Sequence, residues 1–211
     1  MLHYTKEDLG LLNSRYRANM INSCTGYKSC NLLATQSAHG TSNLAVFNSV
    51  VHIGSNPAML GFVLRPLTVR RDTYNNFKET GHFTVNQVNA PMIKGAHATA
   101  AKYDEGVSEF SKSGFTEAYL DGFAAPYVKE SHIKIGCSYK NEYKIAENGC
   151  LLIIGAIEHI YLEDGMVHQD GWVQLDATDT VSAVGVDAYA LPKIVDRFSY
   201  PRPDEAPKSI L

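Results

Sequence analysis

The sequence predicts a mainly β protein with inserted helices, arranged as an antiparallel barrel, and three observations favour this class. Six or more segments have the β-branched and aromatic composition of strands and end at turn residues. Two of them, 44–53 and 59–64, follow each other across a short Pro turn, as an antiparallel pair does. Neither GxGxxG after a strand nor GxxxxGK followed by Ser or Thr occurs, so nothing indicates a Rossmann fold or a P-loop. The strand count favours a closed antiparallel barrel over an α/β sheet.

The first half of the chain is expected to contain two helices besides its strands. Residues 1–20 carry charges and apolar groups at mixed spacing, which indicates a short helix. A second helix is expected over 72–81, with Asp72 or Thr73 as its N-cap and Gly81 just past its end. Beside the strand pair, the remaining strands of this half are expected over 31–36 and 82–88.

The second half is expected to begin with helices and to continue with strands. An Ala-rich segment predicts a helix over 91–102, with Pro91 in its first turn, and a further short helix is expected over 109–114. Apolar alternation and turn residues predict the remaining elements: a strand over 131–139, a segment at 143–146 that pairs with it, the most apolar strand over 150–161, a helix near 179–183 and an irregular tail over 189–207.

Length and composition indicate one ordinary globular domain over residues 1–211. No change in composition suggests a second domain, and the apolar and charged fractions are those of soluble proteins. The formal net charge of -3 gives no case for nucleic acid or an anionic membrane as a partner. No apolar run approaches the roughly 20 residues of a membrane span. Because the first residues lack the apolar core of a signal peptide, we expect a cytoplasmic protein.

Cysteine and histidine spacing predicts neither a metal site nor a disulfide framework. The four cysteines have no CxxC spacing, so reduced and mostly buried thiols are expected, although a redox role for Cys24 and Cys30 stays open. The histidines follow no HExxH or paired Cys/His pattern and are expected to be ordinary surface or core residues. No GxSxG segment indicates a nucleophilic serine.

A basic, hydroxyl-bearing segment at the start of the 72–81 helix predicts an anion site. Free backbone N–H groups and the helix dipole favour a phosphate at such a helix start, and guanidinium groups bind phosphate with two hydrogen bonds. A solvated basic turn with a capping threonine is the alternative. The candidate residues are Arg65, Arg70, Arg71 and Thr73.

The strand before this segment predicts the second half of a ligand site. Its amides and hydroxyls could hydrogen-bond the rim of a planar ring, while Phe47 or apolar neighbours cover a face of that ring. A plain core strand is the alternative. The candidate residues are Val46, Phe47, Asn48 and Ser49.

The joint pattern resembles the flavin reductase-like family of FMN-binding split barrels, the family of flavoredoxin. In that family a Thr-Ala-Asn-Ser type sequence precedes a Pro-Pro turn by about nine residues. Phe47-Asn48-Ser49 stands at that distance from Pro57, with Val46 in place of the Thr and Ala58 in place of the second Pro. The family's Arg-x-Thr motif is similar to Arg71-Asp72-Thr73, and its Thr-Gly-x-Phe-x-Val-Asn signature to 80–86. More weakly, the resemblance covers most of residues 30–203.

The resemblance implies a homodimer that holds FMN at the subunit interface. Hydride from NADH or NADPH would pass to the flavin and on to a small-molecule or protein acceptor. The flavin would carry the chemistry, so no side-chain general base is expected. The implied contacts are a phosphate site formed by Arg65, Arg71, Thr73 and Arg70, ring contacts from Val46, Phe47, Asn48 and Ser49, and Ser55 near the ribityl chain or ring edge.

Two other functions remain open from the sequence. The first is an FMN-binding electron carrier that lacks its own NAD(P)H activity. The second is a split barrel that has lost FMN and binds another ligand, such as haem. The sequence leaves open the final acceptor, the choice between NADH and NADPH, any partner monooxygenase and whether FMN is retained or exchanged. It also leaves open the role of the Ala-rich segment 90–114.

Overall fold

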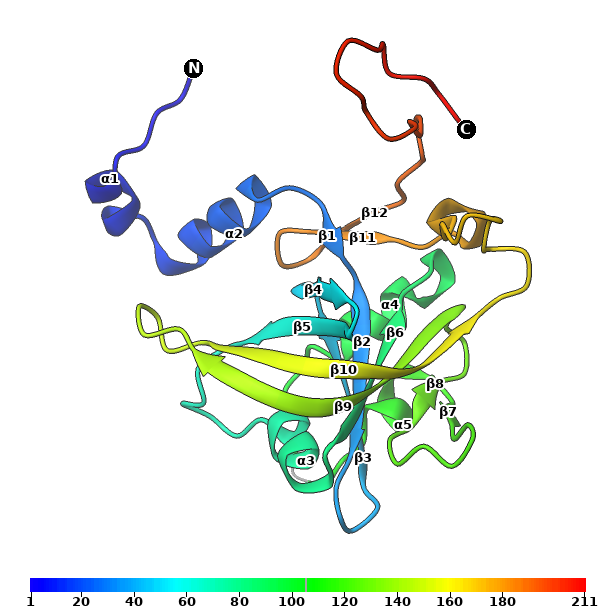
Figure 1. Ribbon diagram of the computed structural model, residues 1–211. Helices are drawn as coiled ribbons and strands as arrows, with labels where there is room; N and C mark the ends of the chain where they lie inside the picture. Colours follow the sequence, from blue (N-terminus) through cyan, green and yellow to red (C-terminus); the bar gives the residue numbers. More distant parts are fainter. Residues whose placement is uncertain (105) are drawn as a thin grey trace.

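The computed structural model describes residues 1–104 and 106–211, and its central feature is a seven-stranded antiparallel sheet (Figure 1). Every pairing in this sheet is antiparallel, as the sequence predicted. Its strands, in spatial order, are β3 (Ser42–Phe47), β2 (Asn31–Gln36), β6 (His82–Gln87), β9 (Ile133–Lys144), β10 (Leu151–Leu162), β5 (Ala58–Leu64) and β4 (Val50–Ser55).

The sheet is split rather than closed. Strands β3 and β4 follow each other in sequence but occupy opposite ends of the spatial order, and no ladder joins them within the described parts of the chain. The predicted continuous strand over 44–53 is therefore wrong, because the chain leaves the strand at Asn48 and Ser49. The Ser49 hydroxyl donates to Val63 O at 3.0 Å and accepts from Val63 N at 3.2 Å. These bonds to β5 replace the ladder at the break.

One prediction for the strands around β9 is wrong, and another is confirmed. The segment at 143–146 does not pair with 131–139, because β9 runs without a break to Lys144 and Tyr143 lies opposite Leu152 of β10. The strand predicted over 150–161 is confirmed within one residue as β10. A two-stranded sheet that the sequence did not predict, β7 (Glu117–Ala118) with β8 (Tyr127–Val128), packs beside β6 and β9.

The C-terminal part forms a small sheet instead of the predicted helix near 179–183. A 3-10 helix, η2 (Leu175–Thr178), ends at Asp179, whose φ of 51° lies in the left-handed region. The chain then enters β11, which pairs with β1 on one side and β12 on the other. The bounds are β1 (Lys28–Ser29), β11 (Ser182–Val184) and β12 (Ala188–Ala190).

Two N-terminal helices replace the single short helix predicted over 1–20. Thr5 and Asp8 form a capping box at the start of α1 (Lys6–Leu11), and Asn13 caps α2 (Ser14–Cys24). Neither helix contains a buried residue, and both extend to one side of the barrel in Figure 1. No helix in the described residues is long and apolar enough to span a membrane.

The helix predicted over 72–81 is confirmed as α3 (Asp72–Thr80), but its start differs. The N-cap is Arg71, and no side chain caps the helix, so the prediction of Asp72 or Thr73 is wrong. Gly81 ends the helix with a φ of 77°, as predicted. Burial of Phe77 against Phe62 and Phe83 fixes the helix to the barrel, with ring centroids 6.1 and 6.0 Å apart.

The Ala-rich segment forms shorter helices than predicted. A 3-10 turn, η1 (Ala90–Met92), leads into α4 (Ile93–Ala98), so the helix predicted over 91–102 ends early. The predicted helix at 109–114 is present as α5 (Glu109–Ser113). Met92, Ala96 and Phe110 of this segment pack into the hydrophobic cluster of β2 and β3.

Candidate functional site

The free edge of β3 is covered by side chains from the α4–α5 segment. Leu44 N donates to Glu109 Oε2 at 2.9 Å, and Val46 N donates to Thr99 Oγ1 at 3.0 Å. An uncovered edge strand would leave these N–H groups open to pairing with another strand. The segment 90–114, whose role the sequence left open, therefore protects the edge at which the barrel is split.

The predicted ring contacts lie where the chain crosses from one edge of the sheet to the other. All four residues of 46–49 are half-buried. Phe47 packs its ring against Phe62 at 5.3 Å, inside the aromatic core. Asn48 Nδ2 donates to Gly185 O at 3.0 Å, in the turn between β11 and β12. The segment is thus bordered by α4 through Val46 and by the β11–β12 hairpin through Asn48.

Three of the four predicted phosphate contacts, Arg70, Arg71 and Thr73, lie at the start of α3. Thr73 is buried, and its Oγ1 accepts a hydrogen bond from Asn43 Nδ2 at 3.0 Å. Arg71 Nε is buried and has no hydrogen-bond partner within the described residues. Since no side chain caps this helix, its first-turn N–H groups are also available to an anion.

Arg70 and the two remaining candidates, Arg65 and Ser55, are exposed. Arg70 Nε contacts Asp72 Oδ1 at 2.6 Å, across the first residue of α3. Arg65 is exposed directly after β5. Ser55, at the exposed end of β4, has its Oγ 3.2 Å from His52 Nε2. Arg70, Arg71 and Thr73 are therefore together at one helix start, whereas Ser55 lies at the far end of β4.

A cleft of about 190 Å³ opens beside this helix start. Arg70, Asp72 and Asn76 form one wall, and Asn43 with the turn at 37–42 forms the other. Gly106 and Val107 of the α4–α5 segment line it as well. The cleft lies between the end of β3 that carries Asn43 and the uncapped start of α3.

The chain matches a known protein family. The family described as "Flavin reductase like domain" matches residues 27–175, which is more than half of the chain. The chain belongs to the flavin reductase-like family.

Solved structures of other proteins are similar to this flavin reductase-like protein. A candidate flavin reductase with a split barrel domain from Shewanella frigidimarina is 40% identical, with a TM-score of 0.92 over 95% of this chain and 100% of that one. The 2-nitrobenzoate 2-nitroreductase of Pseudomonas fluorescens is 17% identical, with a TM-score of 0.79 over 98% and 99%. Flavoredoxin of Desulfovibrio vulgaris is 19% identical, with a TM-score of 0.69 over 85% and 92%. The last two support the fold alone.

The family implies a flavin, and the residues at the start of α3 fit its phosphate end. A phosphate at the start of α3 would satisfy the buried Arg71 Nε and the uncapped N–H groups together. At the other end, the Asn48 amide and the Ser49 hydroxyl already have partners within the chain. Contacts to a ring there would come from groups that those bonds leave unused.

Glu109 places a carboxyl group between the two halves of the site. Burial raises the pKa of this carboxyl, the hydrogen bond from Leu44 N opposes that rise, and nearby Asp72 adds to it. The flavin reductase-like protein therefore keeps a half-buried acid beside its predicted phosphate site. Glu109, Asn43 and Thr99 were not predicted as site residues, and the only local signal in the sequence is the polar Asn43 beside an apolar strand.

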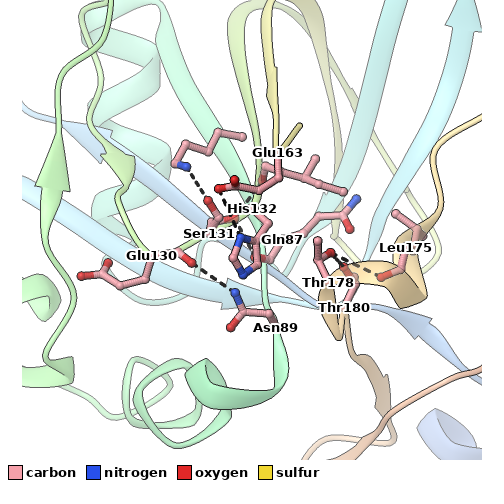
Figure 2. Close-up of polar contacts among 11 residues, drawn as sticks. Gln87, Asn89, Glu130, Ser131, His132, Glu163, Leu175, Thr178 and Thr180 are labelled. Carbon is pink, nitrogen blue, oxygen red and sulfur yellow. Dashed lines mark hydrogen bonds and ion pairs between the residues drawn. The ribbon is translucent and has the colours of Figure 1, made fainter. Parts of the chain in front are cut away.

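A second polar cluster lies where β6 ends and β9 begins (Figure 2). Asn89 Nδ2 donates to Glu130 O at 3.1 Å, and Ser131 Oγ donates to Gln87 O at 2.7 Å. His132 Nδ1 lies 3.3 Å from Glu163 Oε1, beyond the end of β10. These contacts join three strand ends and involve none of the predicted site residues, so we assign the cluster a structural role.

Another open hollow, larger than the cleft beside the start of α3, lies away from the predicted site residues. It measures about 490 Å³ and is lined by Val167, His168 and Arg197, among others. Arg197 pairs with Asp170 and lies 4.6 Å from the ring centroid of Trp172. Its charge is thus already balanced, and the hollow contains no feature that indicates a ligand.

Proposed function

We propose that this protein is an FMN-dependent oxidoreductase that passes hydride from NADH or NADPH to the flavin and on to an acceptor. The observation that carries the proposal is the buried Arg71 Nε, which lacks a partner within the described residues at an uncapped helix start. A buried guanidinium N–H without an acceptor is unfavourable, and a phosphate oxygen supplies that acceptor. The unpaired Arg71 Nε therefore favours FMN, because the terminal phosphate of FMN can supply this acceptor.

Two groups of residues would bind the flavin, one at its phosphate and the other at its ring. At the start of α3, Arg71 and the first N–H groups hold the phosphate, while Thr73 shapes the site through its bond to Asn43. Arg65 and Arg70 add positive charge at the rim. At the other end, the segment 46–49 borders the ring. When bound, the flavin supplies the hydride chemistry, and the protein supplies binding, orientation and exclusion of water.

A homodimer is part of the proposal. Strand β4 is an edge strand, and Val51 and Ile53 on it are 49% and 40% exposed. On the neighbouring β5, Val63 is 36% exposed. A contiguous apolar area on an edge is typical of an interface, and a second copy of the chain covering it would enclose the adjacent segment 46–49.

The visible absorbance spectrum of the desalted protein tests the proposal, recorded under anaerobic conditions before and after adding NADH or NADPH. A flavin spectrum that bleaches supports the reductase and identifies the donor. A flavin spectrum that persists contradicts the NAD(P)H step and favours an electron carrier. Absence of flavin after incubation with FMN contradicts the flavin site itself. Arg71→Ala with Thr73→Ala is the matched variant, and it should lose FMN.

A further inference from the structure

Helix α4 and strand β12 are joined by a histidine–tyrosine pair. His97 Nδ1 lies 2.9 Å from the Tyr189 hydroxyl, and the two rings meet edge to face with centroids 5.8 Å apart. His97 is exposed, whereas Tyr189 is half-buried. The pair therefore holds an imidazole at the surface by means of an anchored phenol.

Both elements of this pair are fixed to the segment 46–49. Thr99, two residues after His97, accepts from Val46 N at 3.0 Å. Gly185, in the turn before β12, accepts from Asn48 Nδ2 at 3.0 Å. The Tyr189 ring packs against the same hydrophobic cluster as Val46. His97 is consequently held at the rim of the segment that the proposed function places beside the flavin ring.

The direction of the hydrogen bond between His97 and Tyr189 sets the tautomer of His97. Burial, with smaller contributions from Cys30 and Asp187, raises the pKa of Tyr189 to about 12, so the phenol stays protonated. Its only hydrogen-bond partner within the described residues is His97 Nδ1. If the phenol donates to Nδ1, a neutral imidazole has its own proton on Nε2. In that tautomer the Nε2–H group, which has no partner in the described part of the chain, is a donor at the rim.

We propose that His97 contacts the flavin ring, with its Nε2–H donating to a carbonyl oxygen of the ring, and that Tyr189 is the residue that positions it. This inference rests on the proposed function. A fixed N–H donor stabilises a carbonyl oxygen most when negative charge builds on the ring, as it does on reduction. His97 would therefore favour bound reduced FMN over bound oxidised FMN.

The test measures the dissociation constants of FMN and of riboflavin, which lacks the phosphate, and the midpoint potential of bound FMN. His97→Leu removes the donor, and we expect about tenfold weaker binding of both flavins, the size of one lost hydrogen bond. We also expect a lower potential, by about 30 mV for each tenfold preference for reduced FMN that is lost. Tyr189→Phe should also weaken flavin binding and lower the potential, but by less than His97→Leu does.

Two variants provide the controls. His97→Gln keeps an N–H donor at similar reach and should restore most of the affinity and the potential. Lys94→Gln, at another exposed position of α4, should leave all three quantities unchanged. Thermal unfolding of each variant in the absence of flavin shows that the fold is retained.

The outcomes separate this inference from the proposed function. If Arg71→Ala weakens FMN binding while His97→Leu changes neither flavin affinity nor the potential, the inference is wrong and the proposed function stands. If the unmodified protein binds no flavin, both are wrong. If His97→Leu weakens FMN but not riboflavin, the histidine acts on the phosphate and the ring contact is contradicted.

Discussion

The side-chain amide of Asn43 donates a hydrogen bond to Thr73 Oγ1 at 3.0 Å, and both residues are buried. This single bond connects the strand that leads to the segment 46–49 with the first turn of α3. A buried polar pair of this kind fixes geometry, because separating it leaves two buried polar groups without their partner. The two halves of the proposed flavin site are therefore held in register by Asn43 and Thr73.

Asn43→Ala tests this connection. We expect the free energy of unfolding to fall by about 1–3 kcal/mol, because the buried Thr73 hydroxyl loses its partner. We also expect weaker FMN binding. Urea unfolding without flavin and an FMN titration measure the two effects. Asn75→Ala, at an exposed position of α3, is the control. Lower stability with unchanged FMN affinity would show that the bond serves the fold alone.

Gly95→Ala tests the cover over the edge of β3. A Cβ at this position would lie 2.7 Å from Ser113 O and 2.8 Å from the Phe115 ring, so α4 must move away from α5. We expect a loss of about 1–3 kcal/mol in unfolding free energy. Amide hydrogen exchange should show faster exchange at Val46, whose N–H bonds to Thr99.

The matched control for that variant is Gly10→Ala in α1. A Cβ there meets no atom within 4 Å, so the exchange of glycine for alanine in a helix should keep or raise stability. Unchanged exchange at Val46 in Gly95→Ala would contradict the role assigned to the α4–α5 segment.

Glu109→Gln tests the half-buried carboxyl through the pH dependence of stability. The pKa of Glu109 is raised in the folded protein, so the folded state binds more protons than the unfolded state between the unfolded and the folded pKa. This group's contribution to stability is fully present below the unfolded pKa and is lost as the pH rises through the folded pKa. Glutamine does not titrate, so the stability of the variant relative to the unmodified protein should rise over the same interval.

Urea unfolding from about pH 4 to about pH 7 measures that difference. Glu147→Gln, at an exposed position, should give a difference that stays constant with pH. A constant difference for Glu109→Gln would mean that the carboxyl is better solvated than its position between α5 and β3 indicates.

Val51→Asp tests the proposed homodimer. A charge placed on the exposed face of β4 should prevent a second copy from covering it, so light scattering after gel filtration should report a monomer. Val167→Asp is the control, because Val167 is 47% exposed and Val51 is 49% exposed. A dimer that persists in Val51→Asp would place the interface elsewhere.

The sequence predicted the antiparallel pairing and the position of α3, because these follow from local patterns. Alternating apolar residues define β6, and Gly81 defines the end of α3. The break between β3 and β4 could not be predicted, since Val50 and Val51 resume the β-branched pattern directly after Asn48 and Ser49, with no Gly or Pro between them. It depends on bonds from distant groups, such as the one between Ser49 and Val63.

The candidate site could likewise be predicted only in part from the sequence. The basic helix start was visible because Arg70, Arg71 and Thr73 are close in sequence. Its partners Asn43 and Glu109 could not be predicted, because they are distant in sequence and only the fold brings them close to it. His97 was expected to be an ordinary histidine, and only its placement beside Tyr189 and the segment 46–49 distinguishes it.

A parallel titration of FMN and riboflavin into the unmodified protein and Arg71→Ala tests the central claim most directly. If Arg71 binds the phosphate, its loss should weaken FMN by about tenfold to a hundredfold and leave riboflavin unchanged. Arg15→Ala, at an exposed position of α2, is the control. Equal affinity of the unmodified protein for FMN and riboflavin, with no effect of Arg71→Ala, would contradict the phosphate site at the start of α3.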